Sequence, residues 1–347
     1  MYKEARALKN AGHRVTLCYA GKPLEEHYPS IDLSIFEKVI PITLPIAQLR
    51  QYESQATLNV FRYIWDLAEN FDLLHCHNEP DIFSTIALAS HRPVIHDTHD
   101  FLSFRGRNSK FFEAMATRGA SGRIYVSQVE LNGAKQLYGI SDKNVVLLPN
   151  YMNRDLVPKV RLKKLSEESG IPHLVAPGKL SSTPDHVYFF LPGITYLVNK
   201  GIHVHLYPYR NQPIEPYKEL ARKSGFLHIH EQKPQVEFLQ ELTQYDIGFT
   251  PWHTPPEKRN DPKTHGHLSN RLMEMVGVGL PVISTNSYAS AEFIRTHDAG
   301  CIVSNGDGLI KAIEKLMGTR ITPKNVYMED NIQQVISLYH TVLNHSS

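Results

Sequence analysis

Three polar residues lie near the start of the segment Ser269–Thr285, which reads SNRLMEMVGVGLPVIST. In a helix, Asn270, Arg271 and Glu274 would share one face close to the N-terminus, because their spacing is i, i+1 and i+4. The first turn of a helix has unpaired N–H groups and the positive end of the helix dipole, which attract phosphate. A carboxylate one turn further could bind sugar hydroxyls. The spacing therefore predicts a site for a sugar and an anion, whereas the simpler interpretation is a solvated ion pair between Arg271 and Glu274.

The residues that follow must hold this helix in place. Gly277 and Gly279 permit close backbone packing, and Gly279 can adopt the left-handed conformation that ends a helix. Pro281 then leads into an apolar strand at Val282–Thr285. Short apolar runs of this kind are expected in a parallel sheet that is covered on both faces.

A second polar group alternates along a predicted strand at Leu73–His77. His75 and His77 point to the same side of that strand. Further potential ligands follow at Glu79, Asp81, His96, Asp97, His99 and Asp100. An HxH pair at a strand end also begins the metal site of amidohydrolase-type hydrolases. That site needs ligands from later barrel strands, which we do not find, so we assign no metal ligands and keep a metal-dependent hydrolase as the least favoured alternative.

His99 and Asp100 follow the predicted strand Pro93–His96. A loop after a buried strand is a position from which side chains reach a binding site. Near neutral pH a histidine can donate a proton to a substrate hydroxyl or accept one, and a neighbouring carboxylate can orient it. We therefore predict His99 and Asp100 as catalytic residues. The alternative is a capped turn with an exposed imidazole.

Cations that could bind phosphate are found in two places. Lys179 follows Gly178 at the end of a predicted strand, Leu174–Ala176, where it would face a ligand. Three more cations lie in a loop rich in proline, Lys258, Arg259 and Lys263. Loop lysines are usually only solvated, so the loop residues are the weaker candidates.

Composition excludes several classes of protein. The chain has 347 residues, 41% of them hydrophobic and 21% charged, as in globular proteins that fold in water. A net charge of +2 gives no indication of nucleic-acid binding. The three cysteines are far apart, which argues against a disulfide framework or a zinc ribbon and favours a reducing compartment. The longest apolar run, Val187–Val198, is too short to cross a bilayer and contains Pro192 and Gly193.

Helix and strand signals alternate along the chain and restart after residues 158–172, a charged segment with few apolar residues. We therefore predict an α/β protein with two Rossmann-like domains facing a cleft, at residues 1–157 and 173–326, joined by a linker at 158–172. Among the predicted elements is a helix at Pro184–Asn199. Residues 327–347 are predicted to form a last helix, and its return to the first domain is implied only by the family resemblance given below.

The chain opens with a predicted helix at Tyr2–Ala11, followed by a strand at Val15–Tyr19. A doubly wound domain normally opens with a strand, and a helix connects one parallel strand to the next. We therefore expect that a strand and its glycine-bearing turn are missing before Met1.

Several segments resemble retaining glycosyltransferases of the GT-B fold, in family 4. SNRLMEMVGVGLPVIST is similar to the donor-site stretch of that family. The resemblance extends in order through DLLHCHNEPD, RPVIHDTHDF, GRIYVSQVELNGAKQLYGI, NVVLLPNYMN, QYDIGFTPW, AEFI and GCIVSNGDG. It covers nearly the whole chain but does not specify a substrate.

The resemblance implies a role for each candidate residue. Glu274 would bind the ribose of a nucleotide sugar, and the amides of Ser269, Asn270 and Arg271 would lie near the diphosphate. Lys179, beside Gly178, matches a basic diphosphate clamp. His99 would contact the donor sugar or the acceptor near the anomeric centre, with Asp100 beside it.

The chain departs from the family pattern at two further points. Gly266 replaces a second acidic residue upstream of the donor-site helix, and the residues Ser182 and Thr183 lie where a second lysine is usual. A degenerate GT-B protein that binds a partner without turnover is therefore the second hypothesis.

The leading expectation is an enzyme that transfers a sugar from a UDP- or GDP-linked donor with retention of configuration. It would use no cofactor and no metal. A glycan or a lipid-linked molecule is the expected acceptor, which would place a cytoplasmic protein in contact with the inner membrane face. Nucleic acid is not an expected partner.

Overall fold

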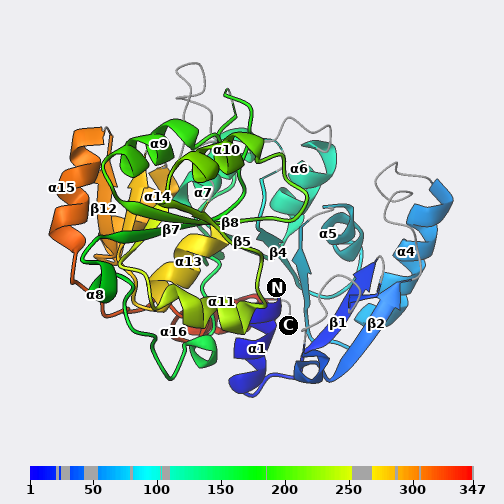
Figure 1. The fold of residues 1–347 in the computed structure, drawn as a ribbon. Coiled ribbons are helices and arrows are strands. Elements are labelled where there is room, and N and C mark those ends of the chain that lie inside the picture. Colours follow the sequence, from blue (N-terminus) through cyan, green and yellow to red (C-terminus); the bar gives the residue numbers. More distant parts are fainter. Residues whose placement is uncertain are drawn as a thin grey trace. The chain divides into compact units, whose positions relative to one another are not determined.

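A computed structural model describes residues 1–347 except 21–22, 25–31, 43–53, 79–80, 102, 104–109, 185, 252–267, 286–287, 305 and 346–347. The chain divides into two compact units (Figure 1). Unit 1 comprises Met1–Pro149 and Met328–Ser347, and unit 2 comprises Asn150–Tyr327. Among the described residues, no helix is long and apolar enough to cross a membrane.

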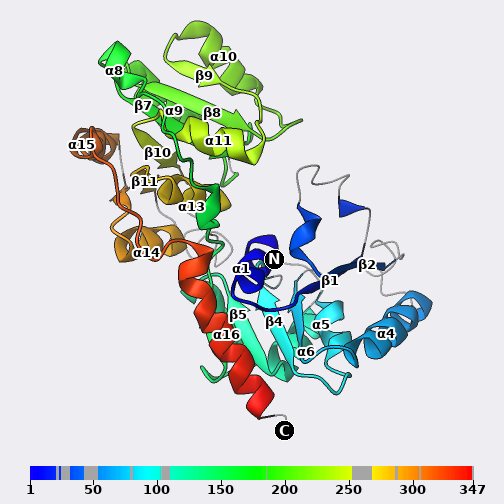
Figure 2. The same ribbon diagram turned by 90° about the horizontal axis from the view of Figure 1, so that it is seen from below.

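Unit 1 is built on parallel strands. Its elements are α1 (Tyr2–Asn10), β1 (Thr16–Ala20), η1 (Leu33–Ile35), β2 (Lys38–Ile42), α4 (Ser54–Ala68), β3 (Leu74–His77), α5 (Ile82–Ala87), β4 (Val94–Thr98), α6 (Lys110–Gly119), β5 (Gly122–Tyr125), α7 (Gln128–Tyr138), β6 (Val145–Leu147) and α16 (Met328–Asn344). The strands form a four-stranded sheet in the order β3-β4-β5-β6 and a separate pair, β1-β2. Helix α16 packs beside α1 and against β5 and β6, as Figure 2 shows for α1.

The register of the larger sheet brings polar residues together. His77 of β3 is the neighbour of Asp97 on β4, and His75 is the neighbour of Ile95. Side chains two residues apart on a strand share a face, so His75, His77 and Asp97 lie on the same side of the sheet.

Unit 2 contains one larger parallel sheet. Its elements are η3 (Arg154–Leu156), α8 (Ser166–Ser169), β7 (His173–Gly178), α9 (Leu191–Asn199), β8 (His203–Pro208), α10 (Glu215–Lys223), β9 (Leu227–Ile229), α11 (Gln235–Leu242), β10 (Ile247–Thr250), α13 (Asn270–Gly277), β11 (Val282–Thr285), α14 (Tyr288–Thr296), β12 (Gly300–Val303) and α15 (Gly306–Leu316). The strand order is β12-β11-β10-β7-β8-β9, and every described pair is parallel. The predicted α/β class with parallel sheets is confirmed.

Two segments differ from their predicted form. The helix expected from Pro184 begins at Leu191, because Pro192 has no N–H to donate and therefore lies in the first helical turn. Residues 158–172, expected to be a linker, contain α8 and are bonded within unit 2. Ser166 Oγ donates to Asp246 Oδ1 at 2.7 Å, and Leu162 N donates to Thr243 Oγ1 at 2.9 Å.

Candidate functional site

Helix α13 begins with a side-chain cap and packs tightly on its sheet. The hydroxyl of Ser269 accepts a hydrogen bond from the backbone N–H of Arg271 at 3.2 Å, which satisfies one of the unpaired amides at the helix start. Gly248 of β10 lets the helix approach, because a Cβ at this position would lie 2.5 Å from Met275 Sδ. The predicted start of the helix and the strand that follows it, Val282–Thr285, therefore agree with the structure.

Glu274 is the acidic group of this helix and is only 4% exposed. Arg271 Nη1 donates to Glu274 Oε2 at 2.6 Å, and Gln235 Nε2 donates to Oε1 at 3.2 Å. Burial lowers the pKa of Arg271, but the facing carboxylate outweighs burial, and the pKa lies above its usual value. The ion pair of the simpler interpretation is therefore formed, but its carboxylate is buried and not on a solvated helix face.

Phe238 and Gly178 are further neighbours of Arg271, in addition to Tyr209. Its guanidinium carbon lies 4.9 Å from the centre of the Phe238 ring. Gly178, at the end of β7, has φ of +117°, and a Cβ there would lie 3.7 Å from Arg271 Cγ. Sequence patterns did not identify Gln235 and Phe238, because α11 is distant along the chain and only the fold brings it to α13.

The remaining predicted donor residues lie at the surface of unit 2. Asn270 and Lys179 are exposed, and Lys179 Nζ lies 5.2 Å from the centre of the Tyr188 ring. The weaker candidates Lys258, Arg259 and Lys263, together with Gly266, fall outside the described residues.

His99 and Asp100 lie in unit 1 just after β4. Asn78, which follows β3, is hydrogen-bonded to the backbone of this loop. Its Oδ1 accepts hydrogen bonds from His99 N at 2.9 Å and from Asp100 N at 3.4 Å. Its Nδ2 donates to Asp100 O at 2.6 Å. Asn78 was not predicted, although its place after the HxH strand was available as a signal.

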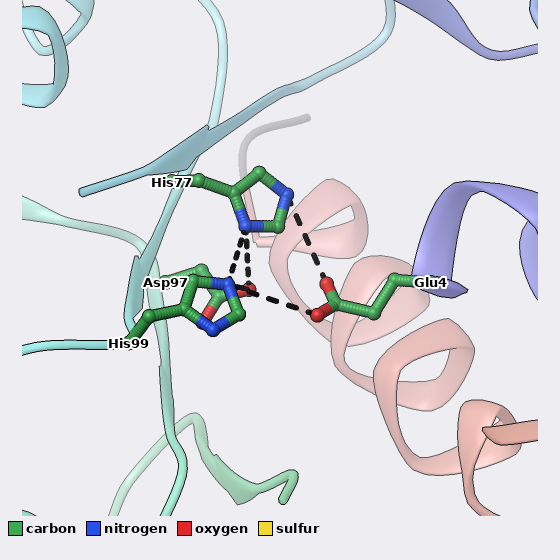
Figure 3. Close-up of side chains that lie close together, drawn as sticks. All are labelled: Glu4, His77, Asp97 and His99. Carbon is green, nitrogen blue, oxygen red and sulfur yellow. Dashed lines mark hydrogen bonds and ion pairs between the residues drawn. The ribbon is translucent and has the colours of Figure 1, made fainter. Parts of the chain in front are cut away.

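The imidazole of His99 points toward a buried polar cluster (Figure 3). Asp97 Oδ2 is 3.0 Å from His77 Nδ1, 3.1 Å from His75 Nε2 and 3.4 Å from His99 Nε2. Glu4 of α1 lies on the other side, with its Oε1 3.8 Å from His99 Nε2. No metal ligand was predicted from the sequence, but the structure brings Glu4, His77, Asp97 and His99 within reach of one ion.

The charges of this cluster are set by burial and by one another. Burial opposes ionisation of Asp97, but His99 and His77 overcome it and hold the pKa of Asp97 well below its usual value. Burial likewise opposes the charge of His99, whose pKa is nevertheless raised by Asp97. Burial, and then Asp97, raise the pKa of Glu4. Asp97 and His99 therefore form the charged pair of the cluster.

Unit 2 contains a separate group of five histidines on neighbouring strands, which we name the histidine ladder: His173, His203, His205, His228 and His230. His173 Nδ1 lies 2.8 Å from His205 Nε2, and His205 Nδ1 lies 2.9 Å from His230 Nε2. His203 and His228 make a similar contact at 2.9 Å. The HxH spacing at 203 and 228 is a sequence signal of this arrangement, which was not predicted.

Comparison with known proteins gives a family match and a fold match. The family model described as Glycosyltransferase Family 4 matches residues 1–156. Comparison with curated protein sequences finds no match.

Solved structures similar to the whole chain are numerous. A glycosyltransferase from Rickettsia africae has 16% identity and a TM-score of 0.66, with 99% of this chain and 89% of that chain covered. HepE from Anabaena, in complex with UDP and glucose, has 16% identity and a TM-score of 0.61 over 98% and 92% of the two chains. Sucrose-phosphate synthase from Thermosynechococcus elongatus has 11% identity and a TM-score of 0.63 over 99% and 89%. At these identities the likeness concerns the fold.

Proposed function

We propose that the chain belongs to glycosyltransferase family 4 and transfers a hexose from a UDP- or GDP-linked nucleotide sugar with retention of configuration, because the family model matches residues 1–156 and the similar solved structures share the GT-B fold. The observation that carries the proposal is the buried carboxylate of Glu274 one turn into α13, held by Arg271 and Gln235. A sugar hydroxyl is a natural partner for such a carboxylate. HepE, of similar fold, was crystallised with UDP and glucose, which favours UDP as the nucleotide.

In this proposal each donor group of unit 2 has one task. Glu274 accepts hydrogen bonds from the ribose. The amides at Ser269, Asn270 and Arg271 lie near the diphosphate, where the helix dipole adds positive potential, although the Arg271 N–H is already bonded to the Ser269 hydroxyl. The Arg271 guanidinium and Lys179, which follows Gly178, supply charge to the same group. Stabilising the leaving diphosphate in this way lowers the barrier to transfer and requires no divalent cation on the phosphates.

The acceptor side of the reaction is assigned to unit 1. We assign His99 to the sugar near the anomeric centre and Asp100 to the support of that contact. Asn78 fixes the backbone of both residues. Glycans and lipid-linked molecules are the proposed acceptors, and a lipid-linked acceptor would bring this cytoplasmic enzyme to the inner membrane face.

The test begins with donor binding. Calorimetry with UDP and with GDP should detect binding by the wild type and a loss of about 10-fold or more in affinity for Glu274→Ala, equivalent to about 1.4 kcal/mol. Glu237→Ala is the matched control, since Glu237 is an exposed glutamate on α11. Chelator treatment should leave UDP affinity unchanged.

Turnover is then measured by mass spectrometry with a panel of UDP- and GDP-linked hexoses. Transfer to an added glycan, or slow hydrolysis of one donor, supports the enzyme. Nucleotide binding without either reaction would favour the degenerate binding protein. Failure to bind UDP and GDP would contradict the proposed donor site itself.

A further inference from the structure

Four side chains from three separate elements converge in unit 1 (Figure 3). Glu4 comes from α1, His77 from β3, Asp97 from β4, and His99 follows β4. The carboxylates are almost fully buried, with 3% of the Glu4 side chain and 1% of the Asp97 side chain exposed. The imidazoles of His77 and His99 are about one-fifth exposed, at 20% and 19%. The group is therefore buried on its acidic side and reachable by solvent through its histidines.

Three of the facing atoms lie close together in a triangle, and hydrogen bonds cannot account for all three contacts at once. His77 Nδ1 lies 2.9 Å from His99 Nε2 and 3.0 Å from Asp97 Oδ2, and the third side, His99 Nε2 to Asp97 Oδ2, is 3.4 Å. Each imidazole nitrogen carries at most one proton, and an ionised carboxylate carries none. If both nitrogens donate to Asp97, their protons face each other. If one donates to the other, the accepting nitrogen faces the carboxylate without a proton.

Two oxygens of the group are also left without hydrogen bonds. Among the residues that the structure describes, Asp97 Oδ1 and Glu4 Oε2 are buried and have no hydrogen-bond partner. Leaving a buried polar atom unpaired costs about 1–3 kcal/mol, and more when the group is charged. Each such atom in a native protein needs an explanation, and a bound ion is one.

A cation placed among the four side chains accounts for the close approach of the three atoms of the triangle and adds positive charge beside the two carboxylates. Each residue offers one ligand atom, and the four atoms lie within 4.8 Å of one another. Around an ion with bonds of about 2.0–2.1 Å, neighbouring ligands are about 3.4 Å apart in a tetrahedron and about 2.9 Å apart in an octahedron. The three sides of the triangle, 2.9, 3.0 and 3.4 Å, have these lengths.

We propose that Glu4, His77, Asp97 and His99 bind a divalent transition-metal ion, with Zn²⁺ as the occupant. Two imidazole nitrogens and two carboxylate oxygens form a ligand set that suits Zn²⁺. His75 supports the site from outside, because its Nε2 contacts Asp97 and its Nδ1 lies 2.6 Å from the Tyr339 hydroxyl. Such neighbours orient the ligands of metal sites.

The metal site shares His99 with the proposed transfer reaction, but its test does not depend on that reaction. Coordination of His99 uses Nε2, so the sugar contact proposed for this residue would use the other ring nitrogen. The ion belongs to unit 1, whereas the proposed diphosphate site belongs to unit 2. Metal content can therefore be measured whether or not the protein has transferase activity.

The experiment uses the full chain after chelator treatment and dialysis. Titration with Zn²⁺ alone, followed by calorimetry and by elemental analysis, should give about one ion per chain. His77→Gln and His99→Gln should each lower the affinity by about 100-fold or more, since loss of an outer-shell partner alone costs about 10- to 100-fold. The matched control is His203→Gln in the histidine ladder, which should bind Zn²⁺ as the wild type does. Circular dichroism checks the folding of each variant.

Co²⁺ supplies a second measurement that needs no variant. Wild-type protein loaded with Co²⁺ should show visible ligand-field absorption that Zn²⁺ abolishes at about one equivalent. The proposal fails if the wild type binds neither ion stoichiometrically. It also fails if folded His77→Gln and His99→Gln bind Zn²⁺ as the wild type does, or if His203→Gln alone abolishes binding, which would place the ion in unit 2.

Discussion

Arg271 and Glu274 form an ion pair in which neither charge is well exposed to water. The side chains are 26% and 5% exposed, and the guanidinium also lies over the Phe238 ring. Replacing Arg271 by methionine keeps most of the packing but leaves the carboxylate unpaired. Because breaking a buried pair costs about 3–5 kcal/mol and this pair is partly exposed, we expect Arg271→Met to lower the free energy of unfolding by about 2 kcal/mol. Urea denaturation measures this loss.

A double variant separates the ion pair from other effects. In Arg271→Met with Glu274→Gln, no charge is left unpaired, so part of the lost stability should return. UDP affinity should remain low in both variants, because both lack Arg271. Equal stability of the wild type and Arg271→Met would show that the pair contributes nothing to folding.

Single residues could be predicted only where chemistry is local in sequence. Arg271 and Glu274 are three positions apart, so helix geometry alone predicted their contact. Glu4 and Asp97 are brought together by the packing of α1 beside the sheet, and no spacing rule joins them. For that reason the histidines near Asp97 were identified as potential ligands, while the complete set was not.

At the scale of elements, local signals decided which boundaries could be predicted. Helix α7 spans Gln128–Tyr138 and has local signals at both ends, because Ser127 caps its start and Gly139, with φ of +67°, ends it. Helix α9 begins at Leu191, later than predicted. The apolar pattern continues upstream of Pro192 and suggested an earlier start. The proline lies in the first turn, because it has no N–H to donate inside a helix. Apolar periodicity identified the helix, but the proline determined its start.

Gly248 determines how closely α13 packs on β10. An alanine Cβ at position 248 would lie 2.5 Å from Met275 Sδ and 3.2 Å from Val282 Cγ2, and both neighbours are buried. Overpacking of this kind costs about 1–3 kcal/mol. We expect Gly248→Ala to lower the thermal unfolding temperature and, by displacing α13, to weaken UDP binding.

The same substitution elsewhere provides the control. Gly193 lies inside α9, and nothing lies within 4 Å of the position of an alanine Cβ. Gly193→Ala should stabilise the protein by about 0.5–1 kcal/mol, because alanine loses less conformational freedom in a helix. If Gly248→Ala were stabilised as well as Gly193→Ala, close packing of α13 on β10 would not explain why position 248 is a glycine.

At the scale of the molecule, the histidine content of the chain has a structural consequence in unit 2. The register places His173 beside His203 and His205 beside His228, with ring centroids 4.2 and 4.5 Å apart. A contact between two imidazole nitrogens needs one nitrogen with a proton and one without. Two touching histidines therefore cannot both be doubly protonated.

The surroundings of the ladder keep its inner members neutral. Burial, followed by the charges of His228 and His230, lowers the pKa of His205 to about 2. Burial, followed by His203, lowers the pKa of His173 to about 4. Other groups around the ladder include Asp246, which accepts from His173 N, Ser169, Tyr245 and the pair Lys233 and Glu241. Of these, Asp246 favours the charged form of His173, but burial outweighs it.

The ladder should make the protein sensitive to acid, and the direction follows from proton uptake. Unfolded histidines bind protons below their usual pKa of 6.5, whereas folded His173 and His205 stay neutral down to lower pH. Unfolding then takes up protons, so stability is complete above about pH 6.5 and falls as the pH approaches about 4. Each proton taken up on unfolding lowers the free energy of unfolding by up to about 1.4 kcal/mol per pH unit. For a domain of this size, each kcal/mol lost lowers the unfolding temperature by about 2–4 °C. Two histidines over this interval contribute up to about 4 kcal/mol, so we expect the unfolding temperature to fall by about 10 °C between about pH 6.5 and pH 5. Replacing His205 by glutamine should reduce this fall, whereas the same change at exposed His340 of α16 should not. Circular dichroism melts of the three proteins at both pH values provide the measurement, and an undiminished fall in His205→Gln would assign the acid sensitivity to other groups.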